Sequence, residues 1–248
     1  MELPMNIYVE RHGAGKPVVF MHGASGSTFS WYFQKEYLKK PMEVILLDLP
    51  GHGKSPGDGC DRLEECREAV HEALKKAGLE KCHMVGHSMG GAIAMLFALT
   101  YPGLLEGLVL VSTGARLRVV PEILEGILKD KEGTVRRIAE LAFSKKAPPS
   151  LVEAGFKEMM KCRQEVIYKD FYSCEQVDLM DGVKRVKLPT LILCGEDDLL
   201  TPPKYSEHLH AEIADSKLVR IPDAGHILML EKPEAVNRAI EEFVIGKP

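Results

Sequence analysis

The segment Gly86-His87-Ser88-Met89-Gly90 carries the strongest signal for chemistry in this sequence. It lies between a strand-like run at 82–85 and an apolar helical segment that begins at Met89. A serine on such a strand-to-helix turn exposes its hydroxyl as a nucleophile, and the flanking glycines make room for the strained backbone. The helix N-terminus adds free N–H groups and the positive end of its dipole. The pattern predicts nucleophilic catalysis by Ser88; the alternative is a glycine-rich turn with an incidental serine.

A serine hydroxyl needs a general base, and His226 is the favoured candidate among nine histidines. Asp223-Ala224-Gly225-His226 follows the last strand-like run, so this loop falls at the carboxyl end of the strands. Open α/β sheets bind their ligands at that end. Other histidines fall inside helical segments or flank strands: His12, His71, His83, His208 and His210. The alternative for His226 is a loop histidine with no catalytic role.

A carboxylate is needed to orient the base, and one acidic loop offers three. Glu196, Asp197 and Asp198 follow the strand-like run at 190–194, again at the carboxyl end. Their spacing leaves the choice among the three open. The alternative for this loop is a solvated acidic turn or a weak cation site.

An oxyanion hole requires donors that are in place before negative charge develops on the substrate. The backbone N–H of Met89, directly after the nucleophile, is one expected donor. The second should come from His22-Gly23-Ala24-Ser25-Gly26, which ends the strand-like run at 18–21. Its glycines allow close backbone approach, and we expect the N–H of Ala24 to be the donor. The alternative is an ordinary glycine turn.

Strands and helices alternate along most of the chain. Short apolar runs bounded by glycine and proline predict buried strands, as in parallel sheets, at 7–9, 18–21, 44–48, 82–85, 108–111, 190–194 and 217–221. Helices are expected at 61–77, capped by Asp61 and ended by Gly78, at 89–101, at 203–213, and from Pro233 onward. This alternation predicts an α/β fold with a doubly wound, mostly parallel sheet.

Residues 115–185 interrupt that rhythm with several helical stretches and no convincing strand. One helix should begin at Pro121, and another should begin at Ser150 with the capping box Ser150-x-x-Glu153. We expect a helical cap at 115–185, inserted into a core formed by 1–114 and 186–248. Candidates to line a substrate pocket, with packing inside the protein as the alternative, are Trp31, Leu117, Val120, Ile123, Leu124, Phe143, Phe156 and Met160.

Composition excludes several other classes of function. The 248 residues carry a formal charge of −4, with 45% hydrophobic and 27% charged residues, as in ordinary globular proteins. There is no basic cluster for nucleic acid, and the longest apolar run is about half of the roughly 20 residues that span a membrane. Residues 1–6 lack the features of a signal peptide. A P-loop is excluded because Asp48 stands where the glycine before Gly53-Lys54-Ser55 would be.

The cysteines indicate a reducing environment. The six are scattered without a CxxC pair, which favours reduced thiols over a disulfide framework or a zinc site: Cys60, Cys66, Cys82, Cys162, Cys174 and Cys194. We therefore expect a cytoplasmic protein that acts on a small molecule, without metal, cofactor, nucleic-acid or membrane partners. The oligomeric state is left open.

The sequence resembles the α/β-hydrolase superfamily over essentially its whole length. The resemblance rests on His22-Gly23, Asp48-x-Pro50-Gly51-x-Gly53-x-Ser55, Gly86-x-Ser88-x-Gly90, Gly195-x-x-Asp198 with Thr201-Pro202, and Gly225-His226. In that family the Gly-x-x-Asp position supplies the acid, which favours Asp198 over Asp197, and the triad runs serine, acid, histidine. The insertion looks like the family's helical cap.

The resemblance implies an esterase-like activity. Members with serine at this position are mostly esterases, lipases, carbon–carbon bond hydrolases and related acyl-transfer enzymes, whereas dehalogenases and epoxide hydrolases place Asp there. We expect a carboxylesterase-like serine hydrolase that cleaves a small apolar ester through an acyl-enzyme. The alternatives are a carbon–carbon hydrolase, a lyase, a perhydrolase, or a non-catalytic ligand receptor on the same fold. Gly91-Ala92 lacks an arginine for a carboxylate-rich substrate, which argues against the lyase.

Overall fold

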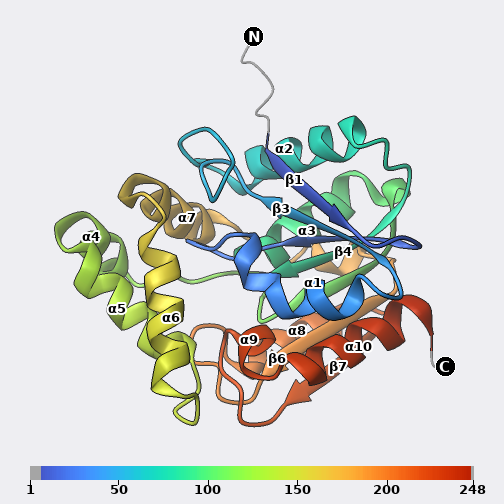
Figure 1. Cartoon of the computed structure of the whole chain (residues 1–248). Helices are drawn as coiled ribbons and strands as arrows, with labels where there is room; N and C mark the ends of the chain where they lie inside the picture. Colours follow the sequence, from blue (N-terminus) through green and yellow to red (C-terminus); the bar gives the residue numbers. More distant parts are fainter. Residues whose placement is uncertain (1–6, 247–248) are drawn as a thin grey trace.

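A sheet of seven strands forms the centre of the described part of the chain, in the order β1-β3-β2-β4-β5-β6-β7 (Figure 1). The computed structural model describes residues 7–246; residues 1–6, on which the signal-peptide prediction rests, and 247–248 lie outside the described residues. β1 runs antiparallel to β3, and every other pair is parallel. The strands are β1 (Tyr8–His12), β2 (Pro17–Met21), β3 (Glu43–Asp48), β4 (Cys82–His87), β5 (Leu105–Val111), β6 (Thr190–Gly195) and β7 (Ser216–Ile221).

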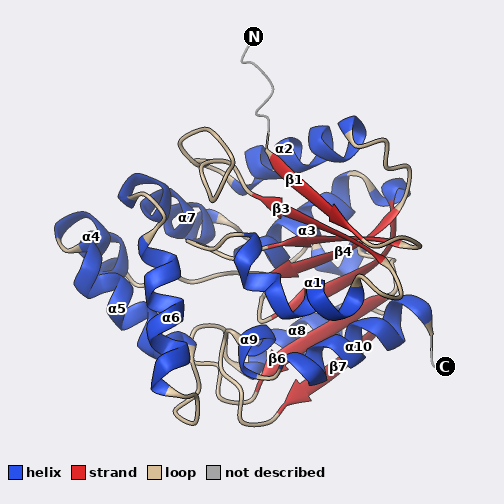
Figure 2. Ribbon diagram, in the orientation of Figure 1, coloured by secondary structure: helices blue, strands red, loops and turns tan. Residues whose placement is uncertain are grey.

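Alternate side chains of each central strand enter two separate apolar layers, because successive residues of a strand point to opposite faces. In β2, Val19 and Met21 pack with helices α2, α3 and α8, whereas Val18 and Phe20 pack with α1, α9 and α10. The bounds are α1 (Tyr32–Leu38), α2 (Leu63–Lys76), α3 (Met89–Thr100), α8 (Pro203–Glu212), α9 (Leu228–Glu231) and α10 (Pro233–Ile245). Figure 2 shows these helices on both sides of the strands. The predicted doubly wound, mostly parallel sheet is confirmed.

Four helices form a separate group beside the sheet, where the loops after the parallel strands meet them (Figure 1). They are α4 (Pro121–Lys129), α5 (Lys131–Ala142), α6 (Pro149–Met160) and α7 (Gln164–Gln176), and we call them the cap helices. Their own small core includes Ile127, Val135, Phe156, Val166 and Ile167. The cap boundaries at 115 and 185 stay a prediction.

Two predicted helix caps were wrong. α2 begins at Leu63 after Arg62, and the backbone N–H of Asp61 donates to Glu65 instead of its carboxylate capping the helix. α6 begins at Pro149, because proline tolerates the first helical position, where no N–H partner is needed. Glu153 is therefore free of a capping role and pairs with Arg136.

The winding of the sheet reverses at β2, which has β3 on one side and β4 on the other. Loops at the carboxyl ends of two such strands diverge and leave a crevice between them. The turn after β2 carries Ala24, and the turn after β4 carries Ser88. Within residues 7–246, no helix is long and apolar enough to cross a membrane.

Candidate active site

Ser88 occupies a strained backbone conformation between β4 and α3, with φ of 52° and ψ of −116°. A positive φ costs a residue with a side chain about 1–3 kcal/mol, so neighbouring contacts must hold it. The Ser88 N–H donates to the carbonyl of Val111 at 2.9 Å, and the Thr113 hydroxyl donates to the Ser88 carbonyl at 2.7 Å. The end of β5 and the loop after it thus fix the turn that presents the Ser88 hydroxyl.

The flanking glycines are required by close backbone contacts. A Cβ on Gly86 would lie 2.2 Å from the carbonyl oxygen of Gly90, and a Cβ on Gly90 would lie 2.5 Å from the carbonyl oxygen of His22. Both distances are shorter than real Cβ contacts. The two glycines of the motif therefore let β4, α3 and the end of β2 come together at Ser88.

His226 is hydrogen-bonded to Asp198. Its Nδ1 lies 2.9 Å from Oδ2 and 3.1 Å from Oδ1 of that carboxylate, and both side chains are buried. Asp198 also accepts hydrogen bonds from the backbone N–H groups of Leu200 (2.9 Å) and Thr201 (2.8 Å) and from the Thr201 hydroxyl (2.8 Å). These bonds place a proton on Nδ1 and leave Nε2 as the basic nitrogen of a neutral His226.

The carboxylate of Asp198 is held in its charged form. Burial opposes ionisation, but the His226 imidazole and the hydrogen bonds from His226 and Thr201 outweigh burial and lower the pKa of Asp198. The other two acids of this loop point elsewhere: Asp197 accepts a hydrogen bond from the Ser144 hydroxyl at 2.6 Å, and Glu196 is exposed. Of the three candidates, Asp198 is the one that the fold places against the histidine.

Two neighbours hold the loop that carries His226. The His226 N–H donates to the carbonyl of Ala142, at the end of cap helix α5, at 2.7 Å. The carboxylate of Glu231 accepts from the N–H of Gly225 at 2.9 Å and from the N–H of Ser144 at 3.0 Å. The cap and the core thus both position the imidazole.

His87 is a site residue that the sequence analysis passed over. Its Nε2 lies 3.0 Å from the carbonyl oxygen of His226, and the two rings lie 4.7 Å apart between centroids. Burial, together with the neighbouring His226, lowers the pKa of His87 to about 3. His87 is therefore neutral and donates to the carbonyl without opposing a positive charge on His226. The sequence feature that could have indicated a role for His87 is its position inside the motif Gly86-x-Ser88-x-Gly90.

An apolar pocket of about 270 Å³ opens in front of Ser88 and His226. Predicted residues that line it are Ala24, Leu117, Val120 and Ile123. Further lining comes from Leu141, Met159, Phe171, Leu199 and Ile227, with Arg118 and Arg137 among the polar groups. Ser88 and His226 thus line one cavity under the cap helices.

For some of the candidate lining residues the structure favours the alternative, packing inside the protein. Trp31 is fully buried and packs edge-on against Phe20, with centroids 5.2 Å apart. Phe143 is buried against Gly155, where a Cβ would lie 2.7 Å from its ring. Within residues 7–246, the pocket lining includes neither of these, nor Leu124, Phe156 or Met160.

The turn with the second expected oxyanion donor approaches Ser88 closely. A Cβ on Gly23 would lie 3.1 Å from the Cβ of Ser88. The turn is closed by the Gly26 N–H donating to the Gly23 carbonyl at 3.1 Å. Within residues 7–246, the Ala24 N–H has no hydrogen-bond acceptor. The Met89 N–H is in the first turn of α3, where helical N–H groups lack an intrahelical partner. Both amides are therefore available for an oxyanion.

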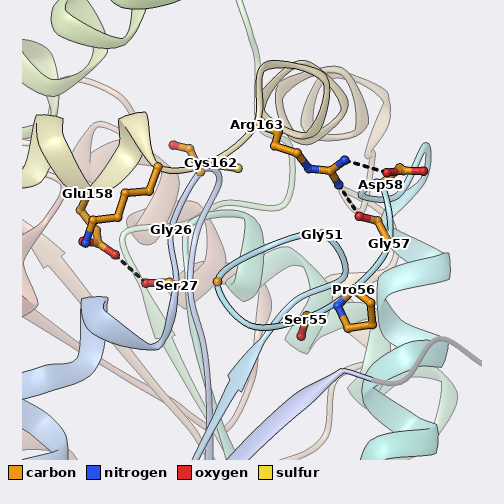
Figure 3. A pocket seen from close by; sticks show the side chains of 13 residues that line it. Gly26, Ser27, Gly51, Ser55, Pro56, Gly57, Asp58, Glu158, Cys162 and Arg163 are labelled. Carbon is orange, nitrogen blue, oxygen red and sulfur yellow. Dashed lines mark hydrogen bonds and ion pairs between the residues drawn. The ribbon is translucent and has the colours of Figure 1, made fainter.

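A second cavity, of about 560 Å³, is lined by residues from the segments 25–27, 51–58 and 158–163 (Figure 3). Arg163 points to Asp58 and Gly57 on its rim, and Glu158 points to Ser27. The triad candidates do not line it, so it is separate from the pocket at Ser88. Among residues 7–246, no cluster of three or more His, Cys, Asp or Glu side chains is placed to hold a metal ion.

Comparison with known proteins places this architecture among familiar ones. A sequence model described as "Alpha/beta hydrolase family" matches residues 18–239. A solved thermophilic esterase is 35% identical, with a TM-score of 0.84 over 96% of this chain and 98% of that one. A malate-bound esterase of Thermogutta terrifontis is 31% identical, with a TM-score of 0.85 over 96% and 92%. A putative 2-succinyl-6-hydroxy-2,4-cyclohexadiene-1-carboxylate synthase of Bacillus subtilis is 27% identical, over 95% and 92%.

Proposed function

Because the chain belongs to the alpha/beta hydrolase family, we propose that it is a serine hydrolase that cleaves small carboxylic esters through an acyl-enzyme intermediate. The observation that carries this proposal is the arrangement at the pocket: Ser88 on its strained turn and His226, bound to Asp198, line the same cavity. The similarity to two esterases at more than 30% identity supports the ester as substrate class. The free, buried cysteines support action in a reducing compartment such as the cytoplasm.

The first half of the proposed reaction forms the acyl-enzyme. Nε2 of His226 accepts the hydroxyl proton of Ser88 as the oxygen attacks the ester carbonyl carbon. The backbone N–H groups of Met89 and Ala24 hold the oxygen that becomes negative. The C–O bond then breaks, and the protonated His226 delivers its proton to the leaving alcohol.

The second half releases the acid. Water attacks the acyl carbon while His226 accepts a proton from the water. The bond between the acyl carbon and the Ser88 oxygen then breaks, and His226 returns the proton to that oxygen. Asp198 stays ionised throughout and stabilises the positive charge that His226 carries in both halves. A neutral His87 at 4.7 Å adds no repulsion to that charge.

The pocket supports a small, apolar substrate. Its volume of about 270 Å³ is at the small end for ligand pockets, which range over roughly 300–1,000 Å³. Aliphatic and aromatic side chains from the cap helices and from the loop after β6 make up most of its wall. We therefore propose short, unbranched acyl groups as the preferred ones.

Turnover of p-nitrophenyl acetate and butyrate tests the proposal. Ser88→Ala should lose at least about a thousandfold in kcat, because the nucleophile is gone and only binding and the oxyanion hole remain. Ser206→Ala, which removes another buried serine hydroxyl, is the matched control and should keep wild-type turnover. Wild-type rates in Ser88→Ala would contradict the assignment.

A lyase is the rival with one specific resemblance, to the putative synthase. Here a Cβ on Gly91 would lie 2.6 Å from the Cγ2 of Thr113, so position 91 has no room for an arginine that would bind a carboxylate-rich substrate. Parallel assays with ester and dienone substrates separate the two chemistries. Tight ligand binding without turnover of either would instead indicate a receptor.

A further inference from the structure

The turn that carries Ala24 contains a second strained serine. Ser25 has a φ of 54° and sits at the third position of the turn Gly23–Gly26. Glycine or asparagine normally occupies a turn position with positive φ, because a Cβ is unfavourable there. The conformation therefore persists only where surrounding contacts hold the peptide between Ala24 and Ser25 in one orientation.

The carbonyl of that peptide accepts a hydrogen bond from the Ser25 hydroxyl at 2.7 Å, and its N–H is bound by the cap. Oδ2 of Asp170, on α7, accepts a hydrogen bond from the Ser25 N–H at 2.7 Å. Asp170 is 3% exposed and belongs to the buried face of α7, together with Val166, Ile167 and Cys174. A carboxylate on this mostly apolar helix face is costly to bury unless it is hydrogen-bonded or paired. The buried carboxylate of Asp170 therefore requires hydrogen-bond donors or a positive charge beside it.

The charge partner of Asp170 is His52. Nε2 of His52 lies 2.8 Å from the same Oδ2, and Nδ1 lies 3.0 Å from the carbonyl oxygen of Pro50. Both neighbours are acceptors, so both ring nitrogens carry protons and His52 is an imidazolium. Burial alone would lower the pKa of His52, but the charge and hydrogen bond of Asp170 outweigh it and raise that pKa well above its ordinary value.

A second histidine holds the other side of the turn and is neutral. Nδ1 of His22 donates to the carbonyl of Gly23 at 2.8 Å, and Nε2 accepts from the N–H of Leu49 at 3.0 Å. Burial and the charge of His52, whose ring centroid lies 4.8 Å away, lower the pKa of His22 well below its ordinary value. The turn is thus fixed from the core through Gly23 and from the cap through Ser25.

We propose that Asp170 is a positioning residue for the oxyanion hole: from the cap, and charge-balanced by His52, it fixes the turn whose Ala24 N–H stabilises the oxyanion. This inference rests on the proposed function. It makes the docking of α7 part of catalysis, because the hole has its full geometry only while Asp170 contacts Ser25. A second contact, from Glu158 of α6 to the Ser27 hydroxyl at 3.0 Å, ties the cap to the same loop at its edge (Figure 3).

The test compares Asp170→Asn and Asp170→Ala with the control Arg163→Gln. Asparagine keeps the shape and an acceptor oxygen but loses the charge, whereas alanine removes both. Arg163, at the N-terminus of the same helix, also joins cap to core, through Asp58 and Gly57, but it does not contact the turn. Measurements are kcat and KM on p-nitrophenyl acetate, the inhibition constant of a trifluoromethyl ketone that forms a tetrahedral adduct, hydrogen exchange in residues 22–30, and thermal unfolding.

The expected result is a selective loss of transition-state stabilisation. Asp170→Ala should lower kcat by about a hundredfold and raise the inhibition constant of the ketone by a similar factor, because the Ala24 N–H is misplaced by less than an ångström. KM should stay within about twofold of the wild-type value. Asp170→Asn should recover about tenfold of that loss, since it restores an acceptor. Hydrogen exchange in residues 22–30 should be faster in both Asp170 variants than in the wild type. Arg163→Gln should match the wild type in every measurement.

Two results separate failure of this inference from failure of the proposed function. Unchanged kcat and unchanged ketone affinity in folded Asp170→Asn and Asp170→Ala, beside an active wild type, would overturn the role of Asp170. If Asp170→Ala does not fold, Asp170→Asn and His52→Gln decide by the same measurements. A wild type that turns over no ester contradicts the proposed function instead. Hydrogen exchange then still shows whether Asp170 holds the turn, and no increase in either variant refutes that as well.

Discussion

Nδ1 of His226 lies 2.9 Å from Oδ2 of Asp198, although the two residues are 28 positions apart in the chain. The Thr201 hydroxyl lies 2.8 Å from that same oxygen and 3.1 Å from Nδ1, so it closes a three-membered network. The network fixes the ring orientation and the tautomer of His226, which decide whether Nε2 can act as a base. The following expectations depend on this contact and on the pocket beside it.

Replacing Asp198 by asparagine should abolish most of the activity without unfolding the protein. The amide would favour the wrong tautomer of His226 and would no longer stabilise its cation, so we expect kcat to fall by about three to four orders of magnitude. Asp197→Asn is the matched control, since that carboxylate contacts Ser144 and not the histidine. Equal losses in the two variants would rule out Asp198 as the orienting acid.

Removing the Ala24 N–H should impair the chemical step and leave substrate binding intact. Ala24→Pro deletes this donor, and one lost oxyanion donor costs about 3–4 kcal/mol in the transition state, or about a hundredfold to a thousandfold in kcat. Ala24→Gly keeps the N–H and should stay close to the wild type. Steady-state kinetics on p-nitrophenyl acetate measure both. A loss of the same size in Ala24→Gly would point to the side chain and away from the amide.

Stability should depend on pH through His87. Its folded pKa is about 3, whereas an unfolded histidine titrates near pH 6.5, so between these values the unfolded chain binds more protons. The free energy of unfolding must then fall as the pH falls through this window, by up to about 1.4 kcal/mol per pH unit for this one group.

Urea unfolding at pH 4, 5, 6 and 7 measures the effect. His87→Gln should give a shallower decrease than the wild type, because the proton-binding group is gone. His210→Gln, at an exposed position, is the control and should follow the wild-type slope. Parallel curves for the wild type and His87→Gln would show that His87 does not carry the dependence.

The pocket should set a limit on acyl length. In a series of p-nitrophenyl esters we expect the highest kcat/KM at two to four acyl carbons and a decrease of at least about tenfold by ten carbons, because the longer chain exceeds the cavity. Leu117→Ala, which enlarges the lining, should move the optimum toward longer chains. Leu128→Ala, on the exposed side of α4, should not. A long-chain optimum in the wild type would contradict the proposed substrate class.

Strands buried on both faces were the part of the fold most visible in the sequence. The run predicted at 44–48 is apolar up to Leu47 and is ended by Pro50, and the bounds of β3, Glu43–Asp48, agree with it to within one residue. The edge strand β1 was placed less well, at 7–9 instead of Tyr8–His12. The second half of β1 carries Glu10 and Arg11. An edge strand is less buried than a central one, so its sequence does not have to be apolar.

Some residues of the candidate site could be recognised in the sequence, whereas others are brought there only by packing. Ser88 and His226 were recognisable as candidates because each sits in a short motif after a strand, and parallel strands bring such loops together. The acidic loop was recognisable in the same way, but the choice of Asp198 within it came from the resemblance to the hydrolase family. The contact of Asp170 with His52 joins residues 118 positions apart, and only the packing of α7 onto the core creates it. An aspartate on an apolar helical face was the available signal, but it does not name its partner. Trp31 follows the loop expected to carry an oxyanion donor, yet its indole is buried in the core.

Trapping of the acyl-enzyme tests the central claim most directly. The wild type is mixed with excess p-nitrophenyl acetate and quenched in acid within milliseconds to seconds. It is then digested, and the masses of its peptides are measured by mass spectrometry. We expect one acetyl group on Ser88, none in Ser88→Ala, and loss of the adduct at the rate of turnover. Ester turnover without acylation of Ser88, or an acetyl group that persists on another residue while turnover continues, would contradict the account.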